Sequence, residues 1–137
     1  MDACEDRVGE TTRVLLVEDH ALFRQAMSHL LHHHSRMEVS QAGTLAEARR
    51  LLGSVDVVAL DNYLPDGAGI DLIGEVRTSN PKASVLVLND APDSANRRSA
   101  LAAGADSVVS KGESAFAIID EITCLGCARQ ASHHTGL

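Results

Sequence analysis

Three acidic residues and one lysine stand at the ends of apolar runs in this 137-residue chain: Glu18, Asp19, Asp61 and Lys111. Carboxylate oxygens are the hard ligands that hold Mg²⁺, and a lysine ammonium neutralises phosphoryl oxygens. If the runs are neighbouring strands, these side chains meet at one place. The residue types then predict a site for a divalent cation and a phosphoryl group.

The apolar runs are typical of buried parallel strands, because they are short, continuous and bounded by turn residues. Five such segments occur along the chain, at residues 13–17, 38–42, 57–61, 84–88 and 106–110. Each is followed by a segment with helical periodicity, and this alternation is typical of a parallel sheet covered on both faces. We therefore expect an α/β, doubly wound fold whose reactive residues lie at the carboxyl ends of the strands.

Helices are expected in the segments that follow the strands, at residues 22–31, 44–52, 70–76, 94–103 and 115–122. Thr44 and Glu47 have the spacing of a capping box at the start of the second helix. Gly104 follows the fourth helix and is expected to close it in a left-handed conformation. Residues 124–137 contain Gly, Ser and His and are expected to form a loosely ordered tail.

Composition excludes several classes of partner. The formal net charge of −7 argues against a nucleic-acid surface, because such domains carry a basic stripe. Aromatic residues are scarce, so stacking platforms for single strands are absent as well. No apolar run approaches the roughly 20 residues of a membrane span, and residues 1–10 lack the apolar stretch of a signal peptide. The sequence therefore predicts a cytoplasmic protein without membrane or direct nucleic-acid contacts.

The three cysteines, Cys4, Cys124 and Cys127, are too few and too close to the termini for a disulfide framework. Cys124 and Cys127 together with His133 and His134 offer four zinc ligands. The sequence shows no residues that would orient such ligands, and the segment is expected to be flexible. An ordinary tail is the preferred interpretation, with a zinc site as the alternative.

Two other patterns also have an ordinary structural interpretation. The Gly67-x-Gly69 pair suggests a dinucleotide-binding loop, but position 72 is Leu where a third glycine belongs, and the pair follows Pro65 rather than a strand. The run His32-His33-His34 lies at the expected end of a helix, where histidines interact favourably with the helix dipole. A metal site formed by this run is the alternative.

The ordered set of motifs resembles the receiver domains of bacterial two-component response regulators, over roughly residues 12–122. The matching parts are Glu18-Asp19, the D-x-x-x-P-x-x-x-G pattern from Asp61 through Pro65 to Gly69, Gly104-Ala105-Asp106, and Lys111. Residues 16–24 look most like the NarL/LuxR-type subfamily, whose receivers precede a LuxR-type helix-turn-helix.

The resemblance implies a (βα)5, flavodoxin- or CheY-like parallel sheet of five strands in the order 2-1-3-4-5. It places the receiver domain at residues 12–123, between a flexible N-terminal segment, 1–11, and a C-terminal tail or linker start, 124–137. It implies a signalling domain rather than an enzyme, with at most self-phosphorylation and slow autodephosphorylation. The implied partner is a sensor histidine kinase or a phosphotransfer protein, and a homodimer is expected through the face around the fourth helix and fifth strand.

Carried over by position, the resemblance makes Asp61 the phosphoacceptor. Asp19, Asp61 and the backbone carbonyl of Tyr63 would ligate Mg²⁺. Glu18 would contribute to that site largely through water, and Lys111 would bind the phosphoryl oxygens.

Three positions depart from the pattern of the family. Asn89 stands where receivers carry Ser or Thr, and its amide can still donate a hydrogen bond to a phosphoryl group. Asp90 stands at a position that is normally small or uncharged, and its carboxylate would oppose the charge of that group. Val108 replaces the aromatic residue whose rotation reports phosphorylation, and valine is stiff at χ1.

Three functions remain open on the sequence alone. The first is a phosphoacceptor receiver in a phosphorelay, with Mg²⁺ as cofactor. The second is an atypical receiver that acts as a protein-interaction module largely independent of phosphorylation, as the three departures suggest. The third is an aspartate-nucleophile phosphohydrolase. Such enzymes need a second acid two residues after the nucleophile, and that residue is Tyr63 here, so this hypothesis is the weakest.

Overall fold

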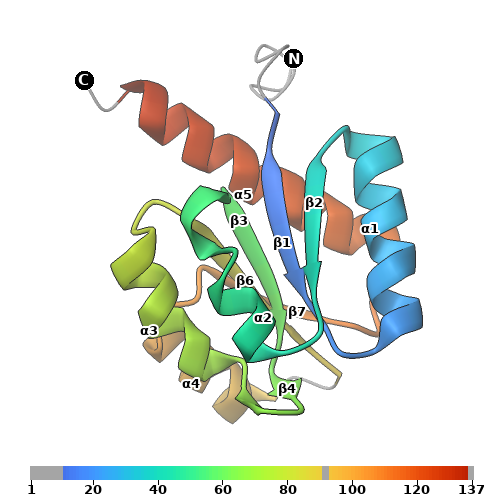
Figure 1. Cartoon of the computed structure of the whole chain (residues 1–137), viewed down its shortest axis with the longest axis vertical. Helices are drawn as coiled ribbons and strands as arrows, with labels where there is room; N and C mark the ends of the chain where they lie inside the picture. The colour runs from blue at the N-terminus through green and yellow to red at the C-terminus, as the bar shows by residue number, and fades with distance from the viewer. Residues whose placement is uncertain (1–10, 91–92, 136–137) are drawn as a thin grey trace.

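The computed structural model describes residues 11–90 and 93–135 (Figure 1). The segment 1–11, predicted to be flexible, lies outside these ranges except for Thr11. Five parallel strands form one sheet: β1 (Arg13–Val17), β2 (Glu38–Ala42), β3 (Val57–Asp61), β6 (Ser84–Asn89) and β7 (Ser107–Ser110). Their spatial order is β2-β1-β3-β6-β7. The predicted fold class is confirmed, and with it the order 2-1-3-4-5, because β4 and β5 form a separate hairpin.

Helices cover both faces of this sheet, as Figure 1 shows. They are α1 (Ala21–Ser35), α2 (Leu45–Arg49), α3 (Ile70–Ser79), α4 (Ser94–Ala102) and α5 (Ala115–Thr135). Each of the five expected helices is present. The second is shorter and the fifth is longer than the sequence predicts.

Two cores lie on opposite faces of the sheet, because successive side chains of a strand point in opposite directions. One core joins alternate strand residues to α2, α3 and α4; its members include Leu15, Val58, Val87, Leu72 and Ala100. The other joins the remaining strand residues to α1 and α5; its members include Leu16, Ala59, Leu86, Leu31 and Ile122. Since both faces of β1, β3 and β6 are covered, their sequences are continuous apolar runs rather than alternating ones.

The predicted cap of α2 is present, with one difference. The hydroxyl of Thr44 accepts a hydrogen bond from the N–H of Glu47 at 3.1 Å. The carboxylate of Glu47 reaches back to the N–H of Gly43 at 2.9 Å rather than to that of Thr44. α2 then ends at Arg49, and the following chain tightens into a 3₁₀ turn at Leu52–Ser54. The apolar periodicity therefore extends further than the α-helix itself.

Gly104 closes α4 as predicted, by a Schellman motif. Its φ angle is 113°, a region that L side chains rarely adopt. The N–H of Gly104 donates to the carbonyl of Leu101, and the N–H of Ala105 donates to the carbonyl of Ala100. This pair of bonds satisfies the last carbonyls of the helix and turns the chain towards β7.

The C-terminal segment is a helix through residue 135, so the loosely ordered tail expected from Cys124 onwards is wrong for residues 124–135. The last proline of the sequence is residue 92, so no proline interrupts this helix. Gly126 packs against the start of β1, because a Cβ at this position would lie 2.8 Å from Cγ2 of Thr12. The glycine permits a close approach instead of ending the helix. The domain boundary at residue 123 stays a prediction.

A short antiparallel hairpin follows β3, formed by β4 (Tyr63–Leu64) and β5 (Gly67–Ala68). At its tip, the Asp66 carboxylate accepts hydrogen bonds from the N–H groups of Leu45, at 2.8 Å, and Ala46, at 3.1 Å. The bond from Leu45 is the main cause that lowers the pKa of Asp66. The hairpin is thereby fixed to the N-terminus of α2, where a negative charge is favourable.

Gly69, the residue before α3, lets the chain pass the backbone of Asp61. A Cβ at residue 69 would collide with the carbonyl oxygen of Asp61 and with the side chain of Leu60. We expect Gly69→Ala to lower the free energy of unfolding by about 2 kcal/mol or more, because backbone atoms must move. Urea unfolding measures this change.

Gly74→Ala is the matched control for that prediction, because a Cβ there meets no atom within 4 Å beyond its chain neighbours and the backbone of its own helix. In the middle of α3 the alanine should raise the free energy of unfolding by about 0.5–1 kcal/mol. Equal effects of the two substitutions would contradict the close approach at Gly69.

Candidate functional site

The carboxyl ends of β1, β3 and β7 bring the predicted site residues to one edge of the sheet. Val17 of β1 is in register with Leu60 of β3, so Glu18 and Asp61 follow side by side. Asp61 is in register with Leu88 of β6, whose last residue, Asn89, is the neighbour of Ser110. Parallel pairing thus aligns the strand ends.

Three carboxylates converge at this edge. Glu18, Asp19 and Asp61 each offer an oxygen, and these oxygens lie within 4.8 Å of one another. Glu18 is fully buried and Asp61 is 6% exposed, whereas Asp19 faces solvent. Within the described residues this is the one group of three or more such ligands that lies so close together. The predicted acidic cluster is therefore present.

Lys111 lies between the carboxylates. Its Nζ is 2.8 Å from Glu18 Oε2, 3.4 Å from Asp61 Oδ2 and 3.9 Å from Asp90 Oδ1. The ring of Phe23 lies on another side, with its centroid 5.0 Å from Nζ. At this distance a cation attracts the face of an aromatic ring. The ammonium is thus held mainly by Glu18, and it faces Asp61 at a longer distance.

The buried pair has shifted pKa values. Burial is the main cause that raises the pKa of Glu18 above its ordinary value of 4.5, and the charge of Asp61 adds to it. The hydrogen bonds from Lys111 and from the N–H of His20 oppose the rise. Burial alone would lower the pKa of Lys111, but its contacts with Glu18 and Asp61 outweigh burial and raise that pKa above 10.5.

This donor set fits a magnesium ion. Three carboxylates face one ammonium, so the edge carries an excess of negative charge when all are ionised. Oxygen ligands from carboxylates are those that Mg²⁺ takes in proteins. Burial disfavours the charge of Glu18, and a divalent cation nearby would offset that cost.

Tyr63 contacts the site through its backbone. Its N–H donates a hydrogen bond to Asp61 Oδ1 at 3.2 Å, while the residue as a whole is 65% exposed. This bond holds one oxygen of Asp61, and the other oxygen faces Lys111. The role of the Tyr63 carbonyl as a metal ligand stays a prediction.

Two residues of α1 support the site in ways that the sequence analysis did not identify. Arg24 Nη1 donates to the backbone carbonyl of Glu18 at 2.6 Å, and Arg24 Nε donates to the side chain of Gln41 at 3.2 Å. Arg24 therefore ties the turn after β1 to β2. The sequence analysis placed Phe23 in the apolar stripe of α1. Its ring position 5.0 Å from Lys111 Nζ depends on the tertiary fold.

The three positions that depart from the family pattern have different environments. Asn89 is 3% exposed, and neither Nδ2 nor Oδ1 has a hydrogen-bond partner among the described residues. Asp90 has a side chain that is 83% exposed and lies near Lys111. Val108 is buried in the core beneath α4, where its carbonyl accepts a hydrogen bond from Arg97 Nη1 at 3.3 Å. Of the three, only Asn89 presents a buried polar group without a partner.

The other candidate patterns lie outside this cluster. His32 and His33 are on α1, and Gly67 belongs to the β4–β5 hairpin. Cys127 takes part in a disulfide bond, whereas Cys124 is a free, exposed thiol. Zinc binds thiolates, so the two cysteines do not form the pair that a zinc site requires.

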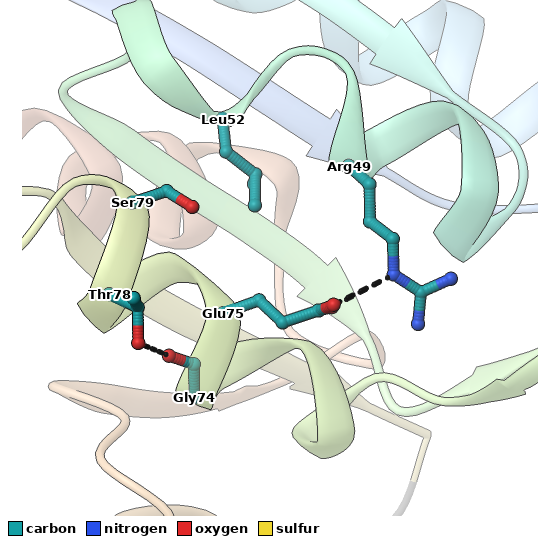
Figure 2. Close-up of a pocket in the computed structure, with 6 residues that line it drawn as sticks. All are labelled: Arg49, Leu52, Gly74, Glu75, Thr78 and Ser79. Carbon is teal, nitrogen blue, oxygen red and sulfur yellow. Dashed lines mark hydrogen bonds and ion pairs between the residues drawn. The ribbon is translucent and has the colours of Figure 1, made fainter.

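We call the sheet edge at which Glu18, Asp19 and Asp61 converge the acidic edge. A cavity of about 320 Å³ lies between α2 and α3, away from the acidic edge. Figure 2 shows Arg49 and Glu75 reaching towards each other across it, with their ion pair at 2.9 Å. Leu52, Gly74, Thr78 and Ser79 complete its lining. It contains none of the predicted site residues.

Residues 14–123 match the family described as the response regulator receiver domain. The chain belongs to this family. It is 34% identical over 107 residues to the probable transcriptional regulatory protein TcrX of Mycobacterium tuberculosis, covering 75% of this chain and 44% of that protein. It is 30% identical over 120 residues to the DNA-binding transcriptional activator DevR/DosR of the same organism, covering 85% of this chain and 55% of that protein.

A solved relative supports the subfamily as well. The receiver aligns with a two-component response regulator of the LuxR family from Aurantimonas sp. SI85-9A1, with a TM-score of 0.80, 28% identity and 88% of each chain covered. This likeness fits the predicted NarL/LuxR type. The chain spans about half the length of the curated relatives described above. Receiver domains are signalling modules whose partners are histidine kinases or phosphotransfer proteins. Within residues 11–90 and 93–135, no helix has the length and apolar character needed to cross a bilayer.

The acidic edge should respond to magnesium. A ligand that binds only the folded state stabilises it by mass action, by about 1.4 kcal/mol at ten times the dissociation constant. We expect millimolar Mg²⁺ to raise the melting temperature of the receiver by about 4 °C or more. Asp19→Asn should reduce this rise, because it removes one of the three converging carboxylates.

Asp120→Asn is the control for the magnesium response, because Asp120 is an exposed acid on α5, outside the cluster. It should leave the rise in melting temperature unchanged. An Asp19→Asn protein that responds to Mg²⁺ like the wild type would show that the ligand assignment is wrong.

The Lys111 ammonium should stabilise the fold up to alkaline pH. Its pKa is raised above 10.5, so its contribution is fully present below pH 10.5 and is lost as the pH rises through the folded-state pKa. Lys111→Met leaves Glu18 and Asp61 without their cation and should cost about 3 kcal/mol near pH 8. Urea unfolding between about pH 8 and pH 11.5 should show that the difference in the free energy of unfolding between the wild type and Lys111→Met becomes smaller as the pH rises. If the difference in the free energy of unfolding stays constant across this pH range, the ammonium of Lys111 does not stabilise the fold in the way described.

Proposed function

We propose that Asp61 accepts a phosphoryl group from a phosphohistidine of a sensor kinase or phosphotransfer protein, in a reaction that requires Mg²⁺. The observation that carries this proposal is the geometry around Asp61. Its carboxylate is within 4.8 Å of oxygens of Glu18 and Asp19, and Lys111 lies 3.4 Å away. A metal ion and an ammonium can there neutralise the charge of a transferring phosphoryl group.

Each residue has a distinct role in this reaction. Asp61 Oδ2 attacks phosphorus, the O–P bond forms, and the P–N bond of the phosphohistidine breaks. The N–H of Tyr63 holds Asp61 Oδ1, which keeps the carboxylate oriented. Bound Mg²⁺, held by Asp19, Asp61 and the Tyr63 carbonyl with Glu18 acting through water, would supply positive charge to the carboxylates and to the phosphoryl oxygens.

Lys111 would exchange partners during phosphorylation. It is now paired mainly with Glu18, at 2.8 Å. A phosphoryl group on Asp61 adds nearly two negative charges beside its ammonium. Lys111 then binds the phosphoryl oxygens, and the exchange offsets part of the added charge.

Asn89 is the second donor for the phosphoryl group. Its buried amide has no partner among the described residues, and such a group costs about 1–3 kcal/mol while it stays unpaired. A phosphoryl oxygen near the end of β6 would accept a hydrogen bond from Nδ2. The amide therefore replaces the hydroxyl that most receivers carry at this position.

Phosphorylation is expected to change the α4–β7 face less than in a standard receiver. A modification shifts a two-state equilibrium only by its different interaction with the two states, and a near-complete switch needs about 5 kcal/mol. Asp90 opposes the added charge, and Val108 is a packed core residue without a ring to rotate. A homodimer through this face would then depend only weakly on phosphorylation.

The phosphohydrolase alternative has no support at this site. Such an enzyme needs an acid two residues after the nucleophile, and Tyr63 occupies that position with an exposed side chain. The receiver family instead agrees with a phosphoacceptor.

Acetyl phosphate tests the acceptor. Incubation with acetyl phosphate and Mg²⁺ should add one phosphoryl group, seen by mass spectrometry, and Asp61→Asn should abolish the addition. Asp90→Asn is the control, because that exposed carboxylate is close to Lys111 but is not the proposed acceptor. A protein that stays unmodified under conditions that label an ordinary receiver would refute the proposal.

The dimerisation of the protein tests whether phosphorylation changes the α4–β7 face only weakly. Light scattering with and without beryllofluoride should show little change in mass for the wild type. The triple variant Asn89→Thr/Asp90→Ala/Val108→Tyr should restore a larger response, because it supplies the hydroxyl, removes the opposing charge and adds a ring. A wild type that dimerises sharply on activation would contradict weak coupling and make Asn89 a competent substitute for the hydroxyl.

A further inference from the structure

The last turns of α1 carry a histidine cluster that the phosphoacceptor site does not use. The helix begins next to the acidic edge and runs back along the sheet, so its C-terminal half lies towards the opposite edge (Figure 1). His29 is eight residues beyond Ala21, which corresponds to about 12 Å along the helix. Any ligand of this cluster is therefore separate from the one at Asp61.

His29 and His33 are the closest pair of histidine rings described on α1. They are four residues apart, both are exposed, and their ring centroids are 4.2 Å apart with the ring planes at 44°. Residues at i and i+4 lie on the same face of a helix. Two histidines at this spacing are the arrangement by which a helix binds zinc in H-x-x-x-H metal sites.

We propose that His29 and His33 bind one divalent transition-metal ion, of the class of Zn²⁺, Ni²⁺ or Cu²⁺. Imidazole nitrogen suits these ions, whereas Mg²⁺ takes oxygen ligands. The two ring centroids are 4.2 Å apart, which is close enough for one ion to reach a nitrogen of each ring. The pair stands near the C-terminus of α1, where the helix dipole favours a positive charge. Water completes the coordination, as in open metal sites.

His32 stabilises this end of the helix but is not a ligand in the proposed site. Its Nδ1 lies 3.2 Å from the carbonyl oxygen of Met37, which can only accept, so Nδ1 carries the hydrogen. Its ring stands edge-on to that of His33, with centroids 5.1 Å apart and planes at 83°. The three rings are not among the groups whose ligand atoms all lie within 4.8 Å of one another in the described residues. The proposed ligands of the metal ion are therefore His29 and His33, without His32.

The experiment is a calorimetric titration of the full, untagged chain with Ni²⁺ or Zn²⁺ near neutral pH, in excess Mg²⁺ so that the acidic edge does not compete. We expect one ion per chain at the pair. His29→Gln and His33→Gln should each weaken the affinity about tenfold or more. His32→Gln is the matched control and should change the affinity by less than about threefold, with circular dichroism confirming that each variant is folded.

Several outcomes would overturn the proposal. One is an affinity for Ni²⁺ or Zn²⁺ that neither His29→Gln nor His33→Gln changes. Another is a loss of affinity in His32→Gln as large as in the other two variants. A third is a stoichiometry of one ion per two chains with a matching rise in mass, because the ion would then bridge two helices. Asp61→Asn should leave this binding unchanged, so failure of this site and failure of the phosphoacceptor are distinguishable.

Discussion

One lysine facing two buried carboxylates is the interaction on which this receiver depends. Glu18 and Asp61 end neighbouring strands, and their charges would repel each other without a cation. Lys111 follows the end of β7, and its Nζ lies 2.8 Å from Glu18 Oε2 and 3.4 Å from Asp61 Oδ2. One ammonium cannot balance three carboxylates, and an oxygen of the exposed Asp19 also lies within 4.8 Å of those of Glu18 and Asp61. The folded domain therefore presents a site with an excess of negative charge, which a divalent cation can balance.

The surrounding structure keeps this cluster in place with backbone contacts. Arg24 holds the carbonyl of Glu18, and Tyr63 holds one oxygen of Asp61. Gly69 lets the chain pass close to the backbone of Asp61, and Asp66 fixes the intervening hairpin to α2. These contacts restrict the loops that follow β1 and β3. A preorganised edge of this kind lowers the cost of reorganisation when charge is transferred.

The apolar runs predicted the parallel sheet and the convergence of the four charged residues, because parallel pairing aligns strand ends whatever the details of packing. The strand order was implied by the resemblance to the receiver family. It did not predict which carboxylate would pair most closely with Lys111, since that depends on side-chain distances set by the tertiary fold. The extension of α5 was missed because Gly126 was interpreted by composition, whereas its packing against Thr12 shows its role. Phe23 lies in its expected helix, and Asn89 ends β6, one residue beyond the expected strand. The ring over Lys111 and the unpartnered buried amide follow only from the packing of α1 and β6. The two ends of α1 also differ in donor type, with carboxylates next to its start and imidazoles near its end.

A crystal structure with Mg²⁺ and beryllofluoride tests the central claim most directly. The account predicts beryllofluoride on Asp61, the metal ion on Asp19 and Asp61, and Lys111 moved from Glu18 to a fluoride. It also predicts that Asn89 Nδ2 donates a hydrogen bond to another fluoride. A structure in which Lys111 keeps its ion pair with Glu18, and beryllofluoride does not occupy Asp61 at saturating concentration, would contradict the account.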